Sequence, residues 1–198
     1  MKLLWIMSLR LAFILSNVPC VAQNVPDVGE LISRLNRPDS TDRAAKQIAE
    51  VATKDAKARE IVVKTLPEMI DKPETDEVWL NAVRLAGQLK VQEAVPSLMT
   101  AFARGPLGGR IGSTMTDEFR LNKDVVAKAL SQIGDPAIPA VTSLLASGEL
   151  KTRRRAVLIL QNMGTPAARK VLQERLPQET NPRIKELIAN GLHDPGPN

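Results

Sequence analysis

The chain has 198 residues, of which 43% are hydrophobic and only 3% aromatic, with three Phe, two Trp and no Tyr. This length and composition allow one domain with a core of Ala, Leu, Ile and Val, and they exclude general disorder. The formal net charge of +5 is too modest to indicate a nucleic-acid-binding protein. Small aliphatic side chains favour close packing of helices over a β-sandwich.

The first 22 residues have the layout of a secretory signal peptide. Lys2 precedes two apolar blocks, at 3–7 and 11–15, and the small residues Cys20 and Ala22 then occupy the −3 and −1 positions of a cleavage site. The sequence therefore predicts cleavage after Ala22 and a secreted or periplasmic protein.

Arg10 leaves a second interpretation of this segment open. A charge inside the apolar region weakens a signal peptide, so the segment could instead stay attached as a helix or a membrane anchor. Only in that case would we expect contact with a membrane. Cleavage would remove the one Cys, and with it any disulfide, Cys-based metal site or thiol nucleophile. It would also leave 25 basic against 22 acidic residues, a net charge of +3.

From residue 27 onward, amphipathic helical segments alternate with short breaks. Apolar residues recur at helical spacing, while Pro, Gly, Asp and Thr at the breaks end one helix and begin the next. We expect no convincing β-strand. The expected helices cover 27–36, 41–53, 57–71, 77–90, 93–104 and 122–133, two segments between 134 and 163, then 166–176 and 182–190.

The helical pattern lapses between residues 105 and 116. Four Gly residues and Pro106 cannot maintain a helix there, so we expect a Gly-rich insertion loop. The resulting domain organisation is a signal peptide at 1–22, a repeat domain at 23–192 that contains this loop, and a disordered tail at 193–198.

Four of the expected helices share one pattern of apolar positions. We take the last apolar residue of each as its reference residue; the residues three, six and seven positions earlier are apolar in all four. At about 100° per residue these positions form one face about 120° wide. The reference residues lie 30 to 44 positions apart, which is typical of stacked helix pairs. They are Val51, Leu89, Ile133 and Met163.

Three segments resemble HEAT repeats, particularly the short bacterial HEAT-like class. They are Ala-Val-Pro-Ser-Leu at 94–98, Gly-Asp-Pro-Ala-Ile-Pro-Ala-Val at 134–141 and Arg-Arg-Ala-Val-Leu at 154–158. The resemblance covers about 28–192 and implies an all-α, right-handed α-solenoid of about five helix pairs. HEAT-like arrays serve mainly as scaffolds, which implies a protein-binding module. A few, such as the HEAT-like bilin lyases, are enzymes, so an enzyme or enzyme accessory is the alternative.

The sequence offers few of the groups that catalysis needs. His193 is the only His and falls in the expected tail, so we expect no His-based dyad, triad or metal site. The Gly-rich segment 105–110 lacks the strand–loop–helix setting and the Lys-Ser/Thr ending of a P-loop. The acidic pairs at 76–77 and 117–118 begin helices, where negative charge suits the helix dipole. We therefore predict a protein that is not an enzyme and holds no metal or cofactor.

Polar positions on the four aligned helices form a candidate binding surface. The residues one, five and eight before each reference residue point away from the apolar face, towards what is usually the concave side of such an array. We predict a basic ridge that binds an acidic peptide or protein segment, or a polyanionic polymer. Alternatively, these side chains only keep the face soluble. Nucleic acid is not the expected partner, because an exported chain rarely meets DNA. The ridge consists of Arg43, Lys46, Arg84, Gln88, Lys128, Gln132, Arg155 and Asn162.

Overall fold

The computed structural model describes residues 27–35, 41–103 and 124–193. The predicted signal peptide, the insertion loop and the tail from residue 194 onward lie outside these ranges. All regular structure in the described part of the chain is helical, as predicted. The α-helices are α1 (Val28–Leu35), α2 (Thr41–Lys54), α3 (Ala56–Asp71), α4 (Asp76–Gln88), α5 (Val95–Ala103), α7 (Val125–Ile133), α8 (Ile138–Leu144), α9 (Leu150–Met163), α10 (Pro166–Arg175) and α11 (Pro182–His193). Three 3₁₀ turns, η1 (Gln92–Ala94), η2 (Asp135–Ala137) and η3 (Leu176–Gln178), adjoin α5, α8 and α10.

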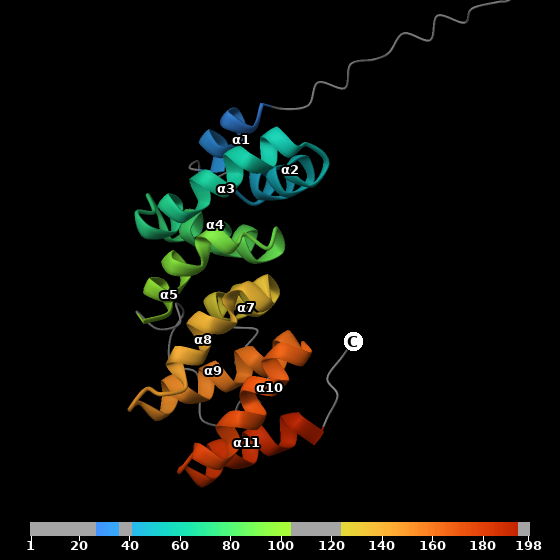
Figure 1. Ribbon diagram of the computed structural model, residues 1–198. Helices are drawn as coiled ribbons and strands as arrows, with labels where there is room; N and C mark the ends of the chain where they lie inside the picture. Colours follow the sequence, from blue (N-terminus) through green and yellow to red (C-terminus); the bar gives the residue numbers. More distant parts are fainter. Residues whose placement is uncertain (1–26, 36–40, 104–123, 194–198) are drawn as a thin grey trace, which may run out of the picture.

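The helices pack as successive pairs in two layers (Figure 1). Within the described residues the pairs are α1 with α2, α3 with α4, α5 with α7, α8 with α9, and α10 with α11. Helices α1, α3, α5, α8 and α10 follow one another in the first layer, and α2, α4, α7, α9 and α11 in the second layer. Because each pair contacts mainly its neighbours, the fold is an all-α solenoid, which confirms the predicted fold class.

The apolar face found in the sequence is the core between the two layers. In α4, α7 and α9, the residues three, six and seven before the reference residue are at most 1% exposed. Burial is less complete at two positions, since Ala45 in α2 and Met163 at the end of α9 are only partly buried. Helix α2 belongs to the first pair of the described array and has no second-layer helix before it. The repeat pattern is therefore confirmed, with Ala45 and Met163 as its two less buried positions.

Glycines end α7 and α9 in backbone conformations that other residues rarely adopt. Gly134 has φ of 79° and Gly164 has φ of 64°. After Gly164, the hydroxyl of Thr165 accepts a hydrogen bond from the backbone N–H of Ala168 at 3.2 Å, which caps α10. The breaks between helices are thus specified locally.

The last helix is longer than the sequence indicated. Helix α11 continues through Gly191 to His193, so the prediction that His193 lies in a disordered tail is wrong. Gly191 does not end the helix. Instead, its missing Cβ makes room for the side chain of Gln161 from α9, which donates a hydrogen bond to the carbonyl of Leu187 at 2.7 Å.

Helices α4 and α7 approach each other closely at Gly87. A Cβ at this position would lie 2.7 Å from Cα of Ala129 and 2.5 Å from Oε1 of Gln132. We expect Gly87→Ala to lower the free energy of unfolding by about 1–3 kcal/mol, because the two helices would have to move apart. The sign of this change is informative. Ala is the better helix former by about 1 kcal/mol, so without the close contact the substitution would stabilise the fold. Urea denaturation followed by circular dichroism measures the difference.

Gly148→Ala is the matched control for this substitution. Nothing lies within 4 Å of a Cβ built on Gly148, so the exchange should be neutral or slightly stabilising. A Gly87→Ala variant as stable as wild type would mean that α4 and α7 are less closely packed than described.

Candidate binding surface

The second-layer helices contact one another in a constant register. In the interfaces of α4 with α7 and of α7 with α9, the residue two before the reference residue meets the residue four before the reference residue of the next helix. Applied to α9 and α11, this register makes Gly191 the reference position of α11, a helix that the sequence alignment did not include. The contacts are Gly87 against Ala129, the hydroxyl of Ser131 to the carbonyl of Ile159 at 3.4 Å, and Gln161 to the carbonyl of Leu187 at 2.7 Å.

A second repeated contact joins side chains of neighbouring second-layer helices. The Nδ2 of Asn81 in α4 donates to Oδ1 of Asp42 in α2 at 3.3 Å. At the equivalent position of α9, Nε of Arg155 donates to Oδ2 of Asp124, the N-cap of α7, at 2.6 Å. Both donors stand eight positions before their reference residues, so this position faces the preceding helix and not the outer face.

Arg155 is consequently an internal residue, although the sequence placed it on the ridge. Its side chain is 19% exposed and forms an ion pair with Asp124, which is 6% exposed. Its Nη1 donates to the carbonyl of Phe102 at 3.0 Å, and its guanidinium carbon lies 3.5 Å from the centroid of the Phe102 ring. Arg155 therefore joins α5, α7 and α9, and we leave it out of the candidate surface.

The positions one and five before the reference residue form the outer face of the second layer. They are about 40° apart around the helix and so share one narrow strip. In α7 this strip is the whole exposed surface, since Lys128 and Gln132 are its only exposed residues. Arg43 is also exposed, although it stands eight positions before Val51, because no described second-layer helix precedes α2. The exposed members of the predicted ridge are Arg43, Lys46, Arg84, Gln88, Lys128, Gln132 and Asn162.

Two rows of side chains run along this face, across the helices. We call the first the charged row; it holds the residues five before the reference, namely Lys46, Arg84, Lys128, Leu158 and Glu186. We call the second the amide row; it holds the residues one before the reference from α4 onward, namely Gln88, Gln132, Asn162 and Asn190. All are exposed except Leu158, which is partly buried.

Sequence reasoning missed Glu186 and Asn190. The sequence alignment covers four helices and not the last one, in which Lys185 interrupts the apolar face. Ile184 and Ile188, which are both buried, have the same four-residue spacing as Ala156 and Leu160 of α9. That spacing was the signal that could have found them.

Lys46, Arg84 and Lys128 give the charged row a positive section. None of the three forms an ion pair within the described part of the chain. Glu50, one turn from Lys46, is instead paired with Lys54 at 2.6 Å, and that hydrogen bond and charge lower the pKa of Glu50. Packed helices lie about 8–10 Å apart, which is close to the Debye length at physiological salt, so the potentials of the three cations overlap.

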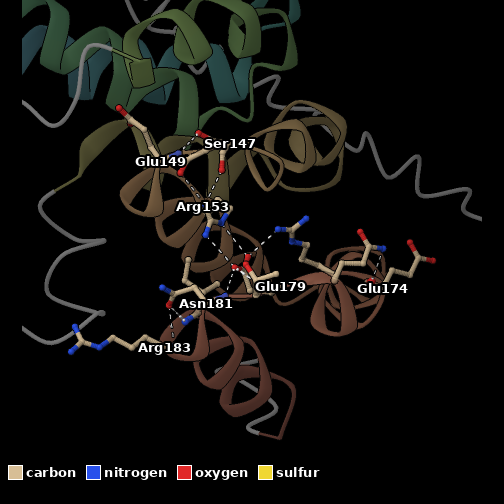
Figure 2. A network of polar contacts seen from close by, with 12 residues as sticks. Ser147, Glu149, Arg153, Glu174, Glu179, Asn181 and Arg183 are labelled. Atoms are coloured by element: carbon tan, nitrogen blue, oxygen red, sulfur yellow. Dashed lines mark hydrogen bonds and ion pairs between the residues drawn. The ribbon is translucent and has the colours of Figure 1, made fainter.

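Among the described residues, the carboxyl group with the largest pKa shift lies elsewhere, at the junction of α9, α10 and α11 (Figure 2). Glu179 is 3% exposed and accepts hydrogen bonds from the Nε of Arg153 at 3.2 Å, the Nη2 of Arg175 at 3.0 Å and the backbone N–H of Asn181 at 3.0 Å. Burial, the largest single influence, raises the pKa of Glu179. The hydrogen bonds from Asn181, Arg153 and Arg175 together outweigh it and lower the pKa to about 2.

This network is structural. A carboxylate that stays ionised above pH 3 can neither donate nor recover a proton near neutral pH, so Glu179 is unsuited to general acid–base catalysis. Arg153 also donates to the carbonyls of Ser147 and Gly148 at 2.9 and 3.2 Å, which ties the segment after α8 to the same point.

In the described ranges, no group of three or more His, Cys, Asp and Glu residues could hold a metal ion. No helix described here is long and apolar enough to cross a membrane.

Comparison with known proteins supports a repeat architecture. Residues 110–193 match the family model described as HEAT repeats. No curated protein matches the chain. Among solved structures, the crystal structure of an engineered protein is similar to 84% of this chain and 95% of its own length, with 19% sequence identity and a TM-score of 0.33. The repeat architecture is supported instead by the family model over residues 110–193 and by the packing of the helices.

Proposed function

We propose that the chain is a non-catalytic scaffold that binds a protein partner on the outer face of its second layer; the match of residues 110–193 to the model of HEAT repeats supports this proposal. Stacked repeats create an extended surface on which the same position recurs from helix to helix, which suits the recognition of another protein. One observation carries the proposal for this face. Lys46, Arg84 and Lys128, which form no ion pair with any other described residue, recur at the same position of three neighbouring helices.

An acidic peptide or protein segment fits this face best. Opposite charges across an interface accelerate encounter and fix orientation, while rim charges add little affinity each. In α4, beyond its first turn, only Arg84 and Gln88 are exposed, so a partner at the centre of the array meets a cation and an amide. A carboxylate of the partner can pair with Arg84, and the partner's backbone groups can form hydrogen bonds with Gln88.

The proposal includes export of the chain. Lys2, the apolar blocks at 3–7 and 11–15, and the small residues Cys20 and Ala22 support a cleaved signal peptide. We expect a mature chain that begins at Gln23 in the secreted or periplasmic fraction. N-terminal sequencing checks this, and an intact Met1 in that fraction would contradict it.

A crosslinking pull-down tests the binding face. The protein, expressed from its full-length sequence, is used as bait in the native secreted or envelope fraction. We compare the wild type with a Lys46→Glu, Arg84→Glu, Lys128→Glu variant, which reverses the positive section of the charged row. We expect the wild type to capture a partner that this variant loses.

The matched control reverses the same number of charges elsewhere. Lys57, Lys151 and Lys170 are exposed and lie outside both rows, so a Lys57→Glu, Lys151→Glu, Lys170→Glu variant should still capture the partner. Equal capture by all three proteins would show that the charged row is only solvated surface. The absence of any partner for the wild type would contradict the scaffold function itself.

A further inference from the structure

We propose that the partner segment lies across the second-layer helices in an extended, polyproline II conformation and carries acidic side chains at every third residue. This inference rests on the proposed function and specifies the partner. Three features of the face carry it: the spacing of the helices, the amide row and the order of residues along the charged row.

The spacing of the charged row selects the conformation of the segment. Packed helices lie about 8–10 Å apart, so successive members of the row are separated by about that distance. A polyproline II segment rises about 3.1 Å per residue with three residues per turn, so every third side chain returns to one face after about 9.3 Å. A β-strand covers a similar distance in three residues, but its side chains alternate, and every third one points away.

A helical partner fits this face less well. Side chains seven residues apart on a helix lie on one face about 10.5 Å apart, so the spacing alone would allow it. However, most of the stability of a bound helix comes from an apolar face packed against its target. The two rows offer one apolar side chain, Leu158, which is itself partly buried.

The amide row suits a polyproline II backbone. This conformation has no internal hydrogen bonds, so its carbonyls and remaining N–H groups need partners. The amide row lies four residues, about 6 Å, from the charged row along each helix. Each side-chain amide both donates and accepts hydrogen bonds. Gln88, Gln132, Asn162 and Asn190 can therefore bind the backbone of a segment whose side chains meet the charged row.

The charged row also has a polarity. From α2 to α11 it reads cation, cation, cation, apolar and anion, because Leu158 and Glu186 follow the three basic residues. The complementary segment carries three acidic side chains, then an apolar one, then a basic one, each separated by two residues. Its acidic end lies over α2 to α7 and its basic end over α11.

Fluorescence anisotropy with synthetic peptides tests this inference on the full-length protein. The test peptide places Glu, Glu, Glu, Leu and Arg at every third position with Pro between them, made in both chain directions. The control has the same composition in shuffled order. We expect one direction of the test peptide to bind about tenfold more tightly than the control, because the shuffled order loses one or two charge pairs.

Charge exchange identifies the contacts. The Arg84→Glu, Lys128→Glu variant should lose the test peptide and regain binding when the two corresponding Glu residues of the peptide are replaced by Lys. The Glu186→Lys variant should prefer a peptide in which Glu replaces the terminal Arg. If the attraction depended only on net charge, binding would not be restored specifically by exchanging the charges at the matching positions of protein and peptide.

Three outcomes would overturn the inference. Equal binding of the shuffled peptide would show that the protein does not recognise the order and spacing of the side chains. Tighter binding of a helical peptide with Glu at every seventh residue would show that the bound segment is a helix and not polyproline II. Tighter binding of duplex DNA through Arg84 and Lys128 would show that the ligand of this face is nucleic acid and not a peptide. In the first two cases the proposed function would still hold if, in the pull-down, the wild type captures a partner and the charge-reversed variant does not. Equal capture in that pull-down would contradict the proposed function instead.

Discussion

Replacement of Glu179 by Ala is expected to lower the free energy of unfolding by about 3–5 kcal/mol. Arg153 and Arg175, whose side chains are 13% and 19% exposed, would keep their charges in a poorly solvated site without a counter-ion. The N–H of Asn181 would also lose its acceptor at the start of α11. Urea denaturation at pH 7 measures the loss, and Glu174→Gln, at an exposed carboxylate of α10, is the control that should change it little.

The same site predicts a specific dependence of stability on pH. Because the pKa of Glu179 is lowered from 4.5 to about 2 in the folded chain, its charge stabilises the fold above pH 4.5. This contribution, about 3 kcal/mol, is lost as the pH falls from 4.5 towards 2. The Glu179→Gln variant lacks it, so the difference in unfolding free energy between wild type and variant should shrink over that interval. A constant difference between pH 5 and pH 2 would contradict the assigned hydrogen bonds.

Replacement of Leu130 by Ala is expected to cost about 2–5 kcal/mol. Leu130 lies three positions before Ile133 in α7, is fully buried, and belongs to a helix that packs against α4, α5 and α9. The cavity cannot close easily, because these neighbours are fixed by their own contacts. Thermal unfolding measures the loss, with Lys128→Ala, exposed on the same helix, as the control. An unchanged melting temperature for Leu130→Ala would mean that the repeat register is incorrect.

The helices and the core could be predicted from sequence because their causes are local. The positions of Ala82, Val83 and Ala86 in α4 follow from the helical period alone, and all three are buried. Gly164 and Thr165 show how the breaks follow from backbone preference and capping. Neither depends on which helix lies next to which.

The side chains between neighbouring second-layer helices could not be predicted in this way. A single helix divides into an apolar and a polar side, whereas a helix inside a stacked layer is also covered by the helix before it and the helix after it. Asn81 and Arg155 are polar and stand on the polar side, yet both point at the preceding helix. Arg84 and Lys128, which lie in the narrow strip left between the two neighbours, remain exposed as the sequence indicated. Gly191 shows the same limit, since its role depends on Gln161 from another helix.

The position of Arg155 bears on how the chain could be re-engineered. One guanidinium binds the carbonyl of Phe102, near the end of α5, and the carboxylate of Asp124, at the start of α7. One side chain therefore fixes the end of α5 to the start of α7. Closing a longer loop between fixed ends costs only about 0.6 kcal/mol for each doubling of its length. We therefore expect a foreign sequence inserted between residues 103 and 124 to leave the register of α5 and α7 unchanged, because Arg155 holds both helix ends in place.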